Sequence, residues 1–406
     1  MPGDLAVSLT ADDLRSGAAE LLDDTVALRR RIHERPELGL HLPRTQETVL
    51  EQLDGLGLDV RTGDALSSIV ADLDAGDGPT VLLRGDMDAL PMTEDTGLDF
   101  ASVEAGRMHA CGHDAHTAML VGAARLLVAH RGELRGRVRF MFQPGEEGPG
   151  GAPHMIDEGV VDGVDAAFAL HVAPNAPTGV VVQRSGPVMA SSDIFEVVVT
   201  GRGGHASTPH WAADPVPVAC EIVLALQAMV TRTVNVFDPT VVTVGRVRAG
   251  TTDNVIPETA ELLGTVRAVS EATRHAVWER IATVADGIAA AHGCTAVVRI
   301  DEGYPVTAND AGFTELAAAA ARTVVGDRRV IELPSPVMGA EDFSYVLQRV
   351  PGAMFFLGVC PPEHANPLVA PACHSNRMVL HEAAMATGVS VHAAVALAAL
   401  EQLAGR

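Results

Sequence analysis

The chain contains no lysine, and all 29 of its basic residues are arginine. This absence excludes a catalytic Schiff-base lysine and also a phosphate-binding loop that ends in Gly-Lys-Ser or Gly-Lys-Thr. Positive charge is also in the minority, since 52 acidic residues outnumber the 29 basic ones and give the 406-residue chain a formal net charge of −23. Nucleic acid and anionic membranes select a basic face, so we expect neither as a partner.

Cysteine is also sparse, with five residues that are widely spaced and include no Cys-x-x-Cys pair. An odd, scattered set argues against a disulfide framework and a thioredoxin-like motif. The N-terminal stretch carries Asp4, Asp12 and Asp13 where a signal peptide needs a basic start and an apolar run. We therefore expect a cytoplasmic protein.

One uncharged run, Ala383–Leu400, is nominally long enough to cross a bilayer. It is mostly alanine and includes Thr387, Ser390 and His392, which predicts a buried C-terminal helix instead of a membrane span.

The hydrophobic patterning predicts two domains with different architectures. In residues 1–186 and 305–406, short β-rich runs alternate with helical runs, which is typical of an α/β fold with a largely parallel mixed sheet flanked by helices. Residues 187–304 instead follow the order βαββαβ, which predicts an inserted ferredoxin-like domain. An amphipathic helix is expected over residues 18–34.

The segment MHACGHDAHTA has the densest group of metal-binding residue types. Cys111 and His113 flank a single glycine, so a tight turn can direct a thiolate and an imidazole at one ion. The alternative is a polar turn before a helix, with Asp114 as its N-cap. His109 and His116 are expected to support the ligands from outside direct coordination.

Glu146 and Glu147 follow a predicted apolar strand, in the Gly/Pro-rich loop QPGEEGPGG. In an extended chain adjacent side chains point in opposite directions, so one carboxylate can bind a metal while the other acts as a general base. The alternative is a solvated acidic loop. His171 and His374 are ambiguous by themselves, although His171 ends a predicted strand and His374 lies before the last predicted helix.

Asp86 and Asp88 follow the predicted strand TVLLRG and share one face of an extended segment. Metal-bound histidines usually donate their second N–H group to a carboxylate, so this pair can orient His113. An acidic turn is the alternative.

The order of these motifs resembles the M20 metallopeptidase/amidohydrolase family, in particular its hippurate hydrolases, N-acyl-amino-acid amidohydrolases and plant indoleacetyl-amino-acid hydrolases. The motifs run RGDMDALPM, ACGHDAHTAML, QPGEEG, ALHV, GRGGHASTPH, TTDNVIPETAELLGTVR, GAEDFSYV and HSNR, and they span about residues 24–400. The shared order and spacing make the resemblance specific. HSNRM departs from the HxPxF pattern common among relatives, which affects the packing around His374.

The resemblance implies a catalytic domain with two divalent metal ions (Zn, Mn, Co or Ni) and a lid or dimerisation domain corresponding to residues 187–304. It places Glu146 as the general base. The metal ligands by resemblance are Cys111, His113, Glu147, His171 and His374.

By resemblance the substrate is a small N-acyl amino acid or peptide-like molecule, hydrolysed at its amide bond. Arg267 and Asn254 resemble the pair that binds the substrate carboxylate. His205 resembles the lid histidine that reaches the partner's site, which implies a homodimer or higher homo-oligomer.

Three alternatives stay open from the sequence. A dipeptidase or aminopeptidase of the same family would need a site for a free amino group. A non-catalytic metal-binding protein would have no need of Glu146 beside Glu147. An enzyme that uses Cys111 as its nucleophile would be insensitive to chelators.

Overall fold

The computed structural model describes residues 9–405, which divide into two compact units. Unit 1 takes the described chain up to Val188, then Ala308–Pro334, and all described residues from Tyr345 onward. Unit 2 takes Met189–Thr307 and Ser335–Ser344. Unit 2 is therefore inserted into the chain of unit 1.

Unit 1 contains a mixed sheet with the strand order β1-β2-β4-β3-β5-β16-β6-β15. The central strands β4, β3, β5 and β16 run parallel, whereas β1, β2 and β6 pair antiparallel to neighbours. Since β3 and β16 are buried along their whole length, both faces of the centre of the sheet are covered. The strands are β1 (Asp59–Thr62), β2 (Ile69–Asp74), β3 (Thr80–Asp86), β4 (Arg137–Gln143), β5 (Ala166–Ala173), β6 (Val181–Gln183), β15 (Val330–Glu332) and β16 (Gly352–Gly358).

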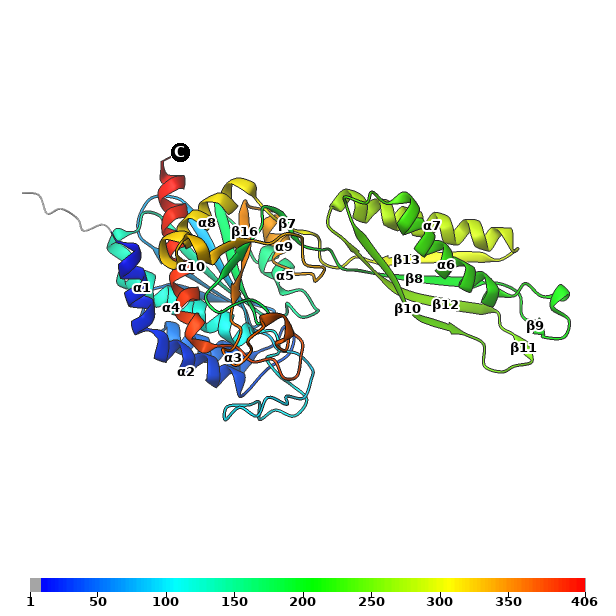
Figure 1. Ribbon diagram of the computed structural model, residues 1–406, viewed down its shortest axis with the longest axis horizontal. Helices are drawn as coiled ribbons and strands as arrows, with labels where there is room; N and C mark the ends of the chain where they lie inside the picture. The colour runs from blue at the N-terminus through cyan, green and yellow to red at the C-terminus, as the bar shows by residue number, and fades with distance from the viewer. Residues whose placement is uncertain (1–8, 406) are drawn as a thin grey trace, which may run out of the picture. The chain divides into compact units, whose positions relative to one another are not determined.

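Helices flank this sheet, as Figure 1 shows. The nearly wholly buried α4 packs on β3, and α10 packs on α1, α4 and α8. The fold class predicted for this part of the chain, a mixed α/β sheet flanked by helices, is confirmed. The helices are α1 (Ala11–Glu20), α2 (Leu22–His33), α3 (Pro43–Leu53), α4 (His113–Ala129), α5 (Gly151–Asp157), α8 (Ala311–Val325), α9 (Ser344–Leu347) and α10 (Met385–Ala404).

The helix predicted over residues 18–34 is in fact two helices. Leu21 ends α1 and precedes α2, and α1 begins earlier, at a capping box between Thr10 and Asp13. The break changes the packing, because α1 contacts mainly α10 and to a lesser extent α4 and α8, while α2 contacts mainly α4. Periodicity alone does not reveal such a change of partner.

The apolar C-terminal run forms a buried core helix, as predicted. Within the described residues, two stretches are long and apolar enough to cross a membrane, Pro215–Thr233 and Glu382–Ala404. In the C-terminal stretch 72% of the apolar segment is buried inside the protein, which is typical of a core helix. Pro215–Thr233 packs its buried face on strands of unit 2.

Unit 2 has the predicted βαββαβ order. Its antiparallel sheet runs β10-β12-β8-β13, and its two central strands, β12 and β8, bury alternate residues against α6 and α7. The elements are β8 (Asp193–Thr200), α6 (Pro215–Thr233), β10 (Thr240–Ala249), β12 (Thr259–Ala268), α7 (Glu271–Ala291) and β13 (Thr295–Asp301). The pairs β9 (Gly204–His205) with β11 (Val255–Ile256), and β7 (Gly186–Met189) with β14 (Thr307–Asn309), form separate two-stranded sheets.

A buried ion pair links the sheet of unit 2 to α7. The Arg274 guanidinium donates to the Asp193 carboxylate at 2.6 Å, and both side chains are almost fully buried. Trp278 donates its indole N–H to the same carboxylate at 3.2 Å. Removing one partner of such a pair would leave a buried charge uncompensated.

Candidate metal centre

The chemically distinctive residues of unit 1 gather at one edge of its sheet. Strands β3, β4 and β5 are parallel, so their carboxyl ends lie together. Asp86 ends β3, the Glu146–Glu147 turn follows β4, and His171 lies near the end of β5. Open α/β sheets hold their sites at this edge.

A glycine turn positions Cys111 and His113. Gly112 has a φ of 86°, and a Cβ atom at this position would lie 2.4 Å from Cγ2 of Val172. Only glycine fits both the backbone conformation and the space. The turn brings the Cys111 thiol and the His113 ring together with His171, and the ligand atoms of these three residues lie within 4.8 Å of one another.

His171 is held in the form that a metal ligand requires. Its Nδ1 atom lies 2.7 Å from the carbonyl oxygen of Val172, which can only accept, so Nδ1 carries the proton. The Nε2 lone pair then faces the Cys111 sulfur at 3.5 Å. Burial lowers the pKa of His171 well below its ordinary value, which keeps the ring neutral.

The His113 ring makes no hydrogen bond within residues 9–405, although both ring nitrogens are buried. Its Nε2 atom lies 3.8 Å from Glu147 Oε1 and 3.9 Å from Glu146 Oε2. Burial opposes a charge on this ring, but Asp86, Asp88 and Glu147 outweigh it and raise the His113 pKa. A buried imidazole without a hydrogen bond, within 4 Å of four carboxylates, fits a cation at this point.

A second group of ligand atoms shares Cys111 with the first. Cys111, Glu147 and His374 also have ligand atoms within 4.8 Å of one another, and His374 Nε2 lies 3.2 Å from Glu147 Oε1. His374 is the one non-glycine residue of the described chain with a positive φ, 69°. Its N–H donates to the carbonyl oxygen of Ala110 at 2.7 Å, which stabilises this conformation.

The donor set suits a divalent transition metal. One thiol, three imidazoles and a carboxylate are ligands that Zn, Co and similar ions accept, whereas Mg and Ca prefer oxygen ligands only. The His113 nitrogens, which make no hydrogen bond within the described residues, and the neutral His171 ring both agree with metal binding. The residues therefore fit the group that the family resemblance implies.

The extended conformation expected for Glu146 and Glu147 is wrong. The two residues lie in a turn that begins after Gly145, which has a φ of 79°. Consequently both carboxylates approach the same atom, His113 Nε2, instead of pointing in opposite directions. Either carboxylate is therefore close enough to take part at the centre.

Asp88 fixes this turn. Its carboxylate accepts the backbone N–H groups of Glu146 at 2.9 Å and of Glu147 at 3.0 Å. The same carboxylate lies 3.4 Å from His113 Nδ1. Asp88 thus positions three candidate residues at once.

Asp86 acts mainly on His116. His116 Nε2 accepts the N–H of Val172 at 2.8 Å, so its Nδ1 carries the proton and donates to Asp86 at 2.6 Å. Arg84 also donates to Asp86, which lies 3.6 Å from His113 Nε2. Burial opposes ionisation of Asp86, but Arg84, His113 and His116 hold its pKa well below the usual range.

A buried charge network under the centre was missed by the sequence reasoning. Asp114 accepts from Arg29 at 2.6 Å and lies 2.7 Å from His33 Nδ1, and all three side chains are buried. His33 Nε2 lies 3.2 Å from Glu94, whose pKa is lowered to about 2 against the effect of burial. The sequence signal was RRRIHERPE in the first helical region, in which Arg29 and His33 lie four residues apart.

His109 lies apart from the two ligand groups. Within the described residues neither of its ring nitrogens has a hydrogen-bond partner, and burial lowers its pKa to about 3.

The candidate substrate residues of unit 2 occupy two separate places. β9 pairs with β11, which sets His205 opposite Val255 and next to Asn254, at one end of the unit (Figure 1). Arg267 lies at the other end of β12, eight residues beyond Thr259. At about 3.3 Å per residue, Arg267 is about 26 Å from the end that carries His205.

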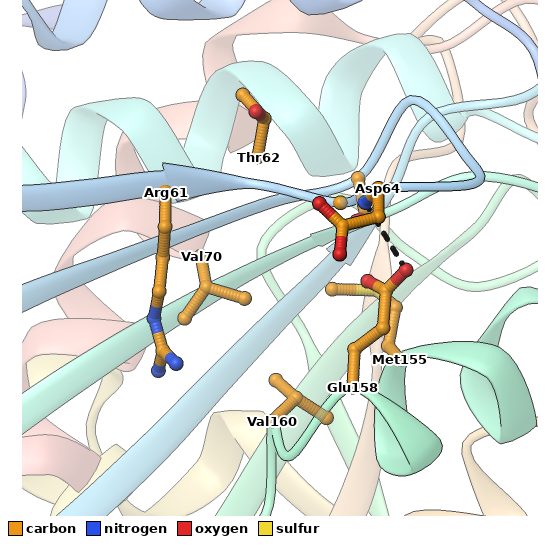
Figure 2. A pocket seen from close by; sticks show the side chains of 9 residues that line it. Arg61, Thr62, Asp64, Val70, Met155, Glu158 and Val160 are labelled. Carbon is orange, nitrogen blue, oxygen red and sulfur yellow. Dashed lines mark hydrogen bonds between the residues drawn. The ribbon is translucent and has the colours of Figure 1, made fainter.

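A surface pocket elsewhere in unit 1 has a volume of about 110 Å³ and shares no lining residue with the metal centre. Figure 2 shows Asp64 and Glu158 close together in it, where the Asp64 N–H donates to Glu158 at 3.2 Å. Arg61 lies apart from both carboxylates in this view.

Fold and donor set together define a metal-dependent hydrolase. The family model described as Peptidase family M20/M25/M40 matches residues 82–398, and the chain belongs to this family. The resemblance seen in the sequence motifs is thereby confirmed.

Relatives with several activities are similar over nearly the whole chain. Thermostable carboxypeptidase 1 of Saccharolobus solfataricus is 38% identical, covering 95% of this chain and 98% of its own. N-acetylcysteine deacetylase of Bacillus subtilis is 38% identical (93% and 97%), and IAA-amino acid hydrolase ILR1-like 2 of Arabidopsis thaliana is 37% identical (95% and 88%). The crystal structure of Bacillus subtilis YXEP protein, a dinuclear metal-binding peptidase, matches with a TM-score of 0.83 at 35% identity, covering 94% of this chain and 99% of its own.

Proposed function

We propose that this enzyme hydrolyses the amide bond of N-acyl amino acids with two divalent metal ions. The observation that carries the proposal is the position of Cys111, which belongs to two overlapping groups of ligand atoms. A thiolate shared in this way would be available to both ions. We assign His113 and His171 to one group and Glu147 and His374 to the other.

The family resemblance assigns proton transfer to Glu146, whose carboxylate also lies in a group of possible ligand atoms with His113 and Glu147. Bound divalent metal supplies Lewis-acid activation of a water molecule and of the substrate carbonyl group. Glu146 accepts the proton of the attacking water and returns it to the leaving amine, so the reaction consumes one water and gives a carboxylic acid and an amine. Asp88 holds the backbone N–H of Glu146 and thereby fixes its place beside His113.

The names of the relatives support amide hydrolysis next to an amino acid, and one of them, a carboxypeptidase, supports a peptide substrate as the second candidate.

We infer that the enzyme acts in the cytoplasm, since all five cysteines are free thiols.

A substrate panel tests the proposal. We expect the enzyme reconstituted with Zn, Mn, Co or Ni to hydrolyse at least one of the N-acetyl, N-benzoyl and indoleacetyl amino acids faster than dipeptides, because dipeptides carry a free, charged α-amino group on the acyl side of the scissile amide and the N-acyl amino acids do not. Chelation should abolish the activity and added metal should restore it. Preferential release of amino acids from dipeptides would favour the peptidase, and chelator-resistant turnover would indicate thiol catalysis by Cys111.

Substitution of the adjacent glutamates separates ligand from base. Glu147→Gln should lose bound metal, because a ligand supplies binding energy, whereas Glu146→Gln should retain metal and lose turnover. Metal content by mass spectrometry and steady-state rates provide the measurement. Cys111→Ala and His171→Ala should behave like Glu147→Gln. A Glu146→Gln protein depleted of metal would contradict the assignment.

Arg267 is proposed to bind the substrate carboxylate. Burial lowers the pKa of Arg267, against the effect of Asp193, and a half-buried guanidinium is a strong donor to an anion. One charged hydrogen bond is worth about 1.5–3 kcal/mol, so Arg267→Ala should reduce kcat/KM about ten- to a hundredfold. The amidated analogue of the same substrate should lose much less. Arg248→Ala, on the neighbouring strand and exposed, is the control, and an equal loss on both substrates would refute carboxylate binding.

We further propose a homodimer in which His205 and Asn254 serve the partner's metal centre. The separation of about 26 Å within unit 2 supports this, because one small substrate cannot contact His205 and Arg267 of the same copy. A two-fold dimer lends each His205 to the neighbouring subunit.

Mixing two inactive variants tests this dimer. His205→Ala and Glu146→Gln should each be nearly inactive, and a mixture that exchanges subunits should regain at most about a quarter of wild-type activity. This follows because about half of the dimers are mixed and each mixed dimer has one intact site of two. Subunit exchange is followed with fluorescently labelled protein. Exchanging mixtures without activity would mean that His205 acts in its own chain or not at all.

A further inference from the structure

A second cysteine lies against the candidate ligand Cys111. Cys373, which is 262 residues away in sequence, has its sulfur 3.9 Å from the Cys111 carbonyl oxygen and 4.0 Å from the Val172 carbonyl oxygen. Both cysteines are free, and Cys373 belongs to none of the ligand groups within the described residues.

The backbone keeps the two cysteines together. The His374 N–H donates to the carbonyl oxygen of Ala110, so the residues that precede Cys111 and follow Cys373 are joined directly. The turn at Gly112 fixes Cys111 on the other side. Disulfide formation therefore requires rotation of the side chains of two residues that are already in contact.

We propose that peroxide converts Cys111 and Cys373 of the metal-free enzyme into a disulfide, and that this disulfide and bound metal exclude each other. The proposal rests on the proposed role of Cys111 as a metal ligand. Cys373 is the more exposed of the two thiols and meets the oxidant first. The protein would then carry a reversible oxidative switch at its own active site.

The chemistry balances with hydrogen peroxide as the oxidant. The Cys373 sulfur takes one hydroxyl group from peroxide and becomes a sulfenic acid, while the thiol proton leaves with the other hydroxyl as water. The Cys111 sulfur then attacks the Cys373 sulfur, the S–S bond forms, and the sulfenic hydroxyl leaves with the Cys111 proton as a second water. Two thiols are oxidised by two electrons, and one peroxide is reduced to two waters.

The disulfide and bound metal exclude each other because both use electrons of the Cys111 sulfur. A thiolate donates a lone pair and a negative charge to a metal, whereas a disulfide sulfur has lost that charge and is a poor ligand. Conversely, a Cys111 thiolate engaged by metal cannot attack Cys373. If bound metal protects Cys111 from disulfide formation, the switch is distinguished from unspecific oxidation.

Peptide mass spectrometry of the full chain tests the proposal. Metal-free protein treated with hydrogen peroxide, alkylated and digested should yield a peptide pair linked between Cys111 and Cys373, which dithiothreitol separates. Zinc loaded beforehand should reduce the linked fraction about tenfold or more. Cys373→Ser should give no link to Cys111, and Cys360→Ser, a buried cysteine elsewhere in unit 1, should link as the wild type does.

Zinc binding before and after oxidation completes the test. Oxidised wild type should bind zinc much more weakly and recover on reduction. The proposal is overturned if no Cys111–Cys373 link forms at peroxide doses that oxidise the exposed Cys220, or if zinc gives no protection. Amide hydrolysis by the reduced, zinc-loaded enzyme is measured separately, so a failure of the proposed function is distinguishable from a failure of the switch.

Discussion

The rest of the metal centre depends on the first turn of α4, which is buried on every side and consists almost entirely of polar residues. His113 faces the candidate ligands, Asp114 pairs with Arg29, and His116 donates to Asp86. Thr117 Oγ1 donates to the Asp86 carbonyl oxygen at 2.7 Å. Buried polar groups without partners cost free energy, so each contact of this turn constrains the helix start to one orientation.

Arginine provides the buried positive charge throughout the described chain. Four buried arginines each pair with a buried aspartate, and the pairs are Arg29–Asp114, Arg84–Asp86, Arg139–Asp72 and Arg274–Asp193. A planar guanidinium can form two parallel hydrogen bonds with one carboxylate, as Arg139 does with Asp72 at 2.8 and 2.9 Å. In a chain without lysine, these pairs position both the metal centre and the core of unit 2.

Contacts between segments that are distant in sequence determine which candidate residues lie together, both at the metal centre and in unit 2. Cys373 meets Cys111 across 262 residues, which places a candidate ligand beside the thiol that we propose forms a disulfide with it when peroxide is present. In unit 2, pairing of β9 with β11 brings His205 beside Asn254, while the length of β12 keeps Arg267 away from both. Such distances decide which residues can serve one substrate together.

Local patterns in the sequence determined the α/β class, the βαββαβ unit and the family, because hydrophobic period and motif order depend on neighbouring residues. The same patterns singled out Cys111, His113 and the adjacent glutamates as metal-centre candidates. Tertiary structure alone decided that Glu146 and Glu147 turn toward the same histidine, since that follows from the Gly145 backbone and from hydrogen bonds to Asp88. It also decided the Arg29–His33–Asp114 network and the Cys111–Cys373 contact, because these join residues whose separation in sequence carries no periodic signal.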